Sequence, residues 1–462
     1  MEKNQNKMGW MPMPKLVISM SLPLMFSLLI QSLYNIVDSI FVARLSQDAL
    51  TATSLAFPLQ LLMIAVAVGT SVGINSLLSK SIGAKNYELT GNIATTGVLL
   101  AVIGTLIFIL LGLACVGRFV GMFTQDAKIG DACGKYLSIC MVFCAGTFIG
   151  TMFQRFLQSV GNTFGSMLTL VAGAVTNLIL DPLLIFGLCG LPAMGIEGAA
   201  IATVIGQWVS AITAVVLNKL QNPLVQPKLK GFRLEKQILA DIYRVGLPTI
   251  ITQALGSLMV SAVNGILMPV SGTAVAFFGI YYKLQSFLFM PMNGLGQATI
   301  PIVGFNYGAK QKDRILQVYR TALPIAVAIA LLATAVFLAA PGWLLGLFSA
   351  REDMLTLGVP ALRIISLTFA PAAITMILGY AASGLGNGLI NMIGTALRQF
   401  VLLVPTVYLL ARYAGISQIW YAFWLSELAA VLYASVRSVE LLRNKNLIQK
   451  QPFFYLTFSK QK

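Results

Sequence analysis

Three carboxylic acids of this chain lie well inside long apolar runs. They are Asp38, Asp181 and Glu427, and the chain has 15 acidic residues in all. An ionised side chain at the centre of a membrane-spanning helix costs roughly 2.5–3.5 kcal/mol on insertion scales. Each acid must therefore be neutral, be paired with a basic residue, or face a cavity that holds a cation. Lys283 and Arg398 also fall within apolar runs and are candidates for such pairing.

The neighbours of the first two acids supply further oxygen ligands. Tyr34 precedes Asp38 by four residues and Asn177 precedes Asp181 by four, so each pair shares one helix face. Thr203, in the sixth apolar run, offers another hydroxyl. Carboxylate, amide and hydroxyl oxygens suit a small hard cation, and two nearby carboxylates in a low dielectric also share a proton. The set predicts a site for Na⁺ or H⁺.

The elements that position these residues follow from the composition. Hydrophobic residues make up 57% of the 462, charged residues make up 10%, and the mean hydropathy is +0.83. Soluble domains carry about 25% charged residues. We therefore expect an all-α polytopic membrane protein whose apolar runs each cross a hydrocarbon core of about 30 Å. The twelve expected spans are 16–42, 50–79, 92–115, 133–156, 164–187, 197–219, 243–269, 273–303, 316–340, 356–381, 389–411 and 417–439.

Several kinds of catalytic site are excluded by residue type. The chain has no histidine, so it can form neither a Ser-His-Asp triad nor a histidine zinc site. Its five cysteines form no CxxC pair. There is also no nucleotide-binding loop. We therefore expect no enzyme and no cofactor, apart from a coupling ion.

The basic residues are distributed unevenly between the two sides of the membrane. With the N-terminus inside, 22 of the 31 Lys and Arg residues, Arg155 among them, fall in inside segments or at the inside ends of spans, seven fall in outside segments or at outside ends, and Lys283 and Arg398 lie deep within spans. The positive-inside rule then places both termini in the cytoplasm of a multi-pass cell-membrane protein. We expect these residues, which give a formal net charge of +16, to contact anionic lipid headgroups rather than nucleic acid.

The two halves of the chain match at a constant offset of 225 residues, and each half contains six spans. An even number of spans gives both halves the same orientation, as in transporters whose repeats are related by an axis along the membrane normal. We expect an N-terminal lobe at 1–221, a cytoplasmic linker at 222–242 and a C-terminal lobe at 243–462 with a basic tail. The matched pairs include Pro23 with Pro248, Gly83-Ala84-Lys85 with Gly308-Ala309-Lys310, and Gly161-Asn162 with Gly386-Asn387.

The repeat does not preserve the acids. Asp38 corresponds to Val263 and Asp181 to Thr406, so ion coupling is expected in the N-terminal lobe. Amide, aromatic and methionine side chains of the C-terminal lobe could line an adaptable pocket for flat lipophilic substrates, or simply face lipid and neighbouring helices. The candidates are Gln253, Asn264, Tyr281, Lys283, Met290 and Glu427.

These features together resemble the multidrug and toxic compound extrusion (MATE) family, in particular its small prokaryotic branch. The resemblance rests on twelve spans in two repeats, the segments SIGAKN and NYGAKQ, Tyr34-x3-Asp38, and Asn177-x3-Asp181-Pro182. It implies an exporter of organic cations and other lipophilic compounds in the cytoplasmic membrane, driven by inward flow of Na⁺ or H⁺. It also implies a cation site in the N-terminal lobe, formed by Tyr34, Asp38, Asn177, Asp181 and Thr203.

The chain departs from this family at two places. The acids that some members carry in spans 7 and 10 are absent, so no ion site is expected in the C-terminal lobe. The segment after span 4 reads Gln158-Ser159-Val160-Gly161-Asn162 where Arg-x-x-Gly-Asp is frequent.

Two other functions remain as alternatives. A flippase for lipid-linked oligosaccharide, from the same superfamily, would need a strongly basic cavity, and only Lys283 and Arg398 lie deep within spans. A channel or a membrane scaffold would not need buried acids confined to one lobe. We expect a monomer whose partners are small molecules and membrane lipids.

Overall fold

The computed structural model describes residues 6–228, 232–348 and 352–448. In that part of the chain the regular secondary structure is entirely helical. The first half contains η1 (Lys7–Gly9), α1 (Met13–Leu45), α2 (Gln47–Gly83), α3 (Tyr87–Ala114), α4 (Val116–Phe123), α5 (Ala127–Val142), α6 (Ala145–Ser159), α7 (Thr163–Phe186), η2 (Leu188–Gly190) and α8 (Gly195–Gln221). The second half contains α9 (Lys236–Leu267), α10 (Gly272–Gly308), α11 (Lys312–Ala339), α12 (Pro341–Gly346), α13 (Glu352–Ser366), α14 (Phe369–Gly384), α15 (Leu389–Ala396), the π-helical turn η3 (Leu397–Val401), α16 (Leu403–Tyr413), η4 (Ile416–Tyr421) and α17 (Ala422–Asn444).

These helices supply the twelve spans expected from the sequence. Among the described residues, nine helices or continuous helical runs are long and apolar enough to cross a membrane. The pairs α5–α6 and α13–α14 each form one more span, bent by 46°. The twelfth is α10, whose 37 residues are less uniformly apolar because Lys283, Gln285 and Asn293 interrupt them. The all-α polytopic fold is therefore confirmed.

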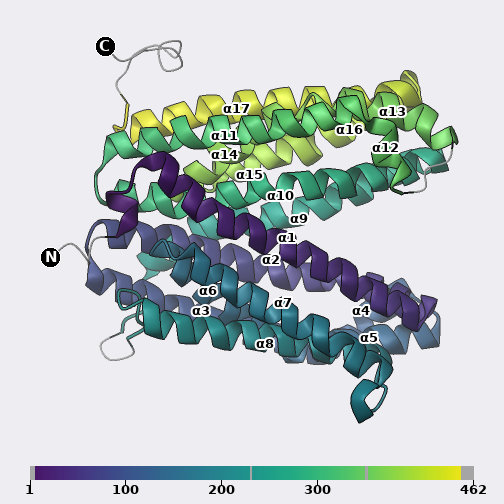
Figure 1. The fold of residues 1–462 in the computed structure, drawn as a ribbon, viewed down its shortest axis with the longest axis horizontal. Coiled ribbons are helices and arrows are strands. Elements are labelled where there is room, and N and C mark those ends of the chain that lie inside the picture. The colour runs from purple at the N-terminus through teal and green to yellow at the C-terminus, as the bar shows by residue number, and fades with distance from the viewer. Residues whose placement is uncertain (1–5, 229–231, 349–351, 449–462) are drawn as a thin grey trace.

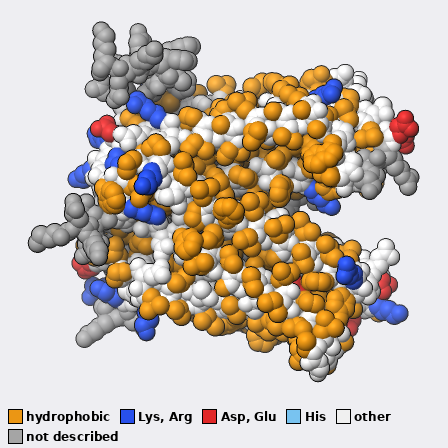
Figure 2. All heavy atoms as spheres, viewed as in Figure 1, with side chains coloured by type: hydrophobic (Ala, Val, Ile, Leu, Met, Phe, Trp, Pro, Cys, Tyr) orange, Lys and Arg blue, Asp and Glu red, His pale blue; other side chains and the backbone are white. Residues whose placement is uncertain are grey.

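The helices form two bundles that lie side by side (Figure 1). Helices α1 to α8 make one bundle, and α9 to α17 make the other. Between them, α1 contacts α10, and α2 contacts both α9 and α10. The start of α1 and the end of α17 lie at the same end of the molecule, where Lys and Arg side chains gather, and the opposite end is hollowed by a cleft between the bundles (Figure 2).

The backbone reproduces the internal repeat in detail. The short helices α4 and α12 occupy equivalent places in the two halves, inside segments that were expected to be loops. Lys85 and Lys310 both have positive φ, at 57° and 59°, and Gly161 and Gly386 have φ of 85° and 82°. Positive φ is costly for residues other than glycine, so its recurrence at the same offset indicates a turn shape kept in both halves.

The bundles approach each other through reciprocal glycine contacts. A Cβ added to Gly83 would overlap the backbone carbonyl of Phe305, and one added to Gly308 would overlap that of Lys80. Since 83 corresponds to 308 and 80 to 305, the same contact is made twice about a local two-fold axis. The contact of Gly69 with Ile250 and that of Gly294 with Met25 are related in the same way.

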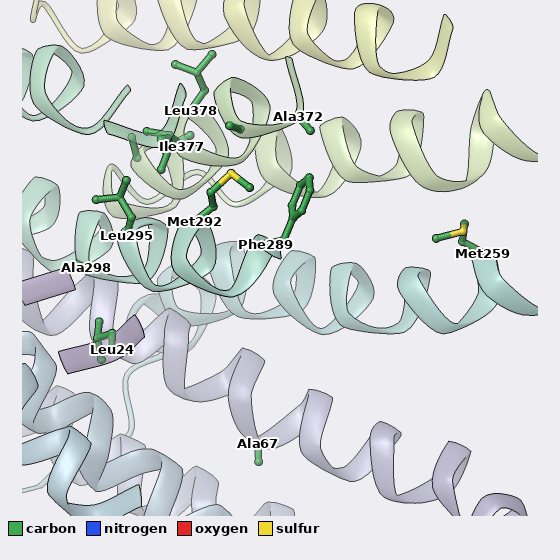
Figure 3. Packing of buried hydrophobic residues seen from close by; sticks show 14 of the residues in the cluster. Leu24, Ala67, Met259, Phe289, Met292, Leu295, Ala298, Ala372, Ile377 and Leu378 are labelled. Atoms are coloured by element: carbon green, nitrogen blue, oxygen red, sulfur yellow. The ribbon is translucent and has the colours of Figure 1, made fainter. Parts of the chain in front are cut away.

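The C-terminal bundle has an apolar interior between α10 and α14. Met292 and Leu295 of α10 lie next to Ile377 of α14, with Phe289 and Ala372 further along the same helices (Figure 3). This packing fixes the face of α10 that lines the space between the bundles.

The segment between the bundles is anchored to the N-terminal one. Asn222 donates to the carbonyl of Phe156 (3.1 Å), and the amide of Lys228 donates to the Thr95 hydroxyl (2.8 Å). Helix α9 begins at Lys236, so the last part of the expected linker 222–242 is helical. Residues 229–231 of this linker and the basic tail from 449 lie outside the described residues.

Candidate cation site and central cavity

Asp38 and Asp181 are brought together where α1 crosses α7. Their carboxyl groups lie within hydrogen-bonding reach of each other. Asp181 is fully buried, and Asp38 is partly buried. Oδ1 of Asp38 and Oδ2 of Asp181 are buried and have no hydrogen-bond donor in the described part of the chain. Two such oxygens facing a second carboxyl group require a proton or a cation.

The other three expected ligands surround this pair. The Asn177 amide nitrogen donates to Asp181 Oδ1 (3.3 Å) and to the Thr203 hydroxyl (3.5 Å). The amide oxygen of Asn177 is buried without a donor, which leaves it free to coordinate an ion. The phenol of Tyr34 interacts electrostatically with both carboxyl groups. All five residues therefore belong to one cluster, supplied by α1, α7 and α8.

Three residues beside this cluster were missed by sequence reasoning. Tyr136 on α5 interacts with both carboxyl groups and with Gln60 of α2, and Cys140 interacts with Gln60 and Asp38. Tyr136 and Cys140 are four residues apart on one helix face, a spacing that could have placed them together. Among the described residues no group of three or more His, Cys, Asp or Glu side chains is placed to hold a metal ion.

The third intramembrane acid is paired instead. Oε1 of Glu427 lies 3.4 Å from Nε of Arg398, and both side chains are more than nine-tenths buried. The guanidinium also lies over the Phe289 ring, 5.7 Å from its centre. Of the two basic partners expected from the sequence, Arg398 makes the pair, whereas Lys283 is exposed.

A cavity between the bundles adjoins the aspartate pair. It consists of two chambers of about 270 and 470 Å³ that share Leu28, Gln31, Gln253 and Gln297 as lining residues. Ligand sites for small molecules span roughly 300–1,000 Å³. The smaller chamber is also lined by Tyr34, Asn177 and Thr203, so three of the five cluster residues border the cavity. The aspartates themselves line neither chamber.

The six candidate substrate contacts of the C-terminal lobe separate into two groups. Gln253 and Met290 line the larger chamber. Asn264, Tyr281, Lys283 and Glu427 line neither chamber. Tyr281 is buried edge-on against Phe423, with ring centres 5.5 Å apart. Its side chain therefore packs against a neighbouring helix, which was the alternative to a substrate contact.

Arg155 lies at the cavity and not in a cytoplasmic segment, where the sequence placed it. It is carried by α6, is 8% exposed and lines the smaller chamber. Nη1 donates to Oε1 of Gln158 (2.7 Å) and to Oε1 of Gln297 (3.0 Å). Arg155 and Arg398 are the charged residues among the described residues that line the two chambers.

Comparisons with known proteins find the same repeat and identify a family. The family model MatE matches residues 23–183 and again 248–409, once in each half. The probable multidrug resistance protein NorM of Thermotoga maritima is 26% identical over 91% of this chain and 90% of its own length. The probable multidrug resistance protein YoeA of Bacillus subtilis is 32% identical over 67% of this chain and 68% of its own length.

A solved structure shows the same fold at lower sequence identity. It is an outward-facing multidrug resistance MATE transporter of the MOP superfamily, 24% identical, with a TM-score of 0.89 over 96% of this chain and 99% of its own. Since the family model covers both repeats, the chain belongs to the MatE family of multidrug efflux transporters.

Proposed function

We propose that the protein exports organic cations and other lipophilic compounds by antiport with Na⁺ or H⁺ bound at Asp38 and Asp181. The observation that carries this proposal is the pair of adjacent carboxyl groups with unsatisfied oxygens beside a cavity of substrate size. Passive channels and scaffolds have no need of such a pair in one bundle. The lobes 1–221 and 243–462 would rock about the linker 222–242.

The orientation follows from the charges. The positive-inside rule places the ends of α1 and α17 that carry the basic residues in the cytoplasm of the cell membrane. The cleft at the opposite end then faces outward, and the glycine contacts close the cytoplasmic side. In this state a cation that enters the smaller chamber from outside would have to pass Tyr34, Asn177 and Thr203, which line it, to reach the buried aspartates.

Coupling arises from the repulsion between the two carboxylates. A bound cation removes that repulsion and lets α1 and α7 approach each other at this point, whereas the empty pair favours their separation. Only a difference in cation affinity between outward-facing and inward-facing states can drive transport. The chain would act as a monomer, with membrane lipids around it and lipophilic substrates in the cavity.

The flippase alternative gains one observation, because Arg155 adds an arginine to the cavity wall. Arg398 is however paired with Glu427, so a polyanionic headgroup would meet a single uncompensated guanidinium. This arrangement favours the antiporter.

The test is ethidium efflux from proteoliposomes under a sodium gradient and, in a separate experiment, under a pH gradient. Vesicles without protein and vesicles without a gradient serve as controls. Efflux driven by one of the gradients is expected, and that gradient identifies the coupling ion. Absence of efflux under both would refute the antiporter and favour the flippase.

A further inference from the structure

A buried charge without an opposite partner lies in the wall of the central cavity. Arg155 is more than nine-tenths buried, and within the described residues no carboxylate lies at ion-pair distance from its guanidinium. Its two hydrogen bonds go to neutral amide oxygens, those of Gln158 and Gln297. Burying an arginine costs several kcal/mol unless a partner compensates for the lost hydration.

The contrast with Arg398 shows what is missing. Arg398 has Glu427 at 3.4 Å, so its charge is compensated within the protein. A guanidinium has five N–H donors in a planar fork. Both hydrogen bonds of Arg155 leave from Nη1, so Nη2 and Nε remain available on a side chain that lines the smaller chamber.

We propose that Arg155 binds the acidic group of amphipathic organic anions, a second class of substrate beside organic cations. Carboxylates, sulfonates and phosphate monoesters match the planar fork of a guanidinium. The apolar body of such a molecule would lie on Leu28, Ile64 and Leu170, which line the same chamber. This inference rests on the proposed function, because it requires that the chamber hold substrate.

The anion contact and the proposed ion site involve different residues. Arg155 lines the smaller chamber, whereas Asp38 and Asp181 line neither chamber and form no ion pair with it among the described residues. An anion at Arg155 therefore leaves the aspartate pair free to take its cation. Cationic substrates would lie nearer the aspartates, at the other part of the same chamber.

A purely mechanical role makes a different prediction. The bond from Arg155 to Gln297 joins α6 of one bundle to α10 of the other, so it could serve only to hold the bundles together. In that case loss of the bond would affect every substrate alike. Gln297→Ala removes the bond and keeps the charge, and Arg155→Gln removes the charge, so the two variants distinguish the roles.

The experiment uses two dyes that share one skeleton. The anion 8-anilinonaphthalene-1-sulfonate and neutral N-phenyl-1-naphthylamine differ by the sulfonate. Their binding is measured by fluorescence titration of the full chain in nanodiscs, with empty nanodiscs subtracted. We expect Arg155→Gln to weaken binding of the anion roughly 10-fold to 100-fold, the range for a hydrogen bond to a charged group, with little effect on the neutral dye. Arg155→Lys should retain part of the affinity, and Arg363→Gln, at an exposed arginine, should match wild type.

Three results would overturn the inference: unchanged anion binding in Arg155→Gln, equal losses for both dyes and for ethidium efflux, or losses in Gln297→Ala of the same pattern as in Arg155→Gln. If Arg155→Gln does not fold, the test rests on wild type and Arg155→Lys. In that case, equal affinity of wild type for the anionic and the neutral dye also overturns the inference. Failure of ethidium efflux under both gradients would refute antiport separately, because the dye titration requires no gradient.

Discussion

Replacing Asp38 by Asn tests the ion site at its most sensitive point. Two unit charges about 4 Å apart at an effective dielectric constant of about 20 interact by about 4 kcal/mol. A cation between Asp38 and Asp181 loses about that attraction when one carboxylate becomes an amide. At 1.4 kcal/mol per tenfold change, and with the amide oxygen still a ligand, cation affinity should fall on the order of 10²- to 10³-fold.

The assay has a binding arm and a transport arm. Thermal unfolding in detergent is followed with and without the coupling ion, since a ligand at 100 times its Kd stabilises the native state by about 2.7 kcal/mol. Wild type should gain this stability. Asp38→Asn should gain almost none, yet should melt no earlier than wild type without the ion, because it has lost a repulsion between carboxylates. Gradient-driven ethidium efflux should be abolished.

The matched control is Asp131→Asn, the same substitution at an exposed acid of α5 that pairs with Lys135 on the surface. It should behave as wild type in both arms. Coupled efflux by Asp38→Asn at the wild-type rate, or an ion-dependent gain in stability equal to that of wild type, would contradict the assignment of Asp38 as an ion ligand.

Three further predictions concern other parts of the structure. Glu427→Gln leaves Arg398 buried without its partner, so the free energy of unfolding should fall by about 3–5 kcal/mol. The spectrum of exported compounds should change while ion coupling persists. Glu440→Gln, in a half-exposed pair, is the control for the denaturation and efflux measurements. Gly308→Ala places a methyl group against the Lys80 carbonyl, so distances between spin labels across the cytoplasmic side should increase and efflux should drop. Gly342→Ala, at a position with open space around it, should change neither. Arg314→Gln removes hydrogen bonds to the carbonyls of Met8 and Met11, so amide exchange of residues 6–11 should become faster. Unchanged exchange would show that this segment is held by other contacts.

The sequence predicted the aspartate cluster from two features: the free-energy cost of a charge inside a membrane span, and the four-residue spacing of the oxygen-bearing neighbours. An acid in an apolar run must be compensated, and the oxygen-bearing residues four positions before Asp38 and Asp181 mark the helix faces that carry the compensation. That reasoning extended to Glu427, whose alternative of pairing with a basic residue is the one that the structure adopts. It could not reach Tyr136 and Gln60, which lie on other helices and are near the aspartates only after folding.

The remaining differences also have physical causes. Arg155 lies close to the end of a span, where arginine side chains usually extend to the headgroups, so the sequence placed it in the cytoplasm. The bend between α5 and α6 falls at Phe143 and Cys144, and neither residue is a proline or glycine that would predict a helix break. Its counterpart between α13 and α14 has the same angle, so the bend belongs to the repeated architecture and not to a local sequence signal.

The internal repeat preserves the glycine contacts between the bundles but not their charged residues. The glycine contacts at positions 83 and 308 are equivalent, so each bundle contributes the same surface to the closed side, and opening that side must break both contacts together. The charged groups are not equivalent: position 38 is an acid and 263 is valine, while position 155 is arginine and 380 is tyrosine. Under the proposed antiport, a symmetric closure would respond to an ion bound in one bundle only. That asymmetry would allow a single aspartate pair to control access to a cavity formed by both bundles.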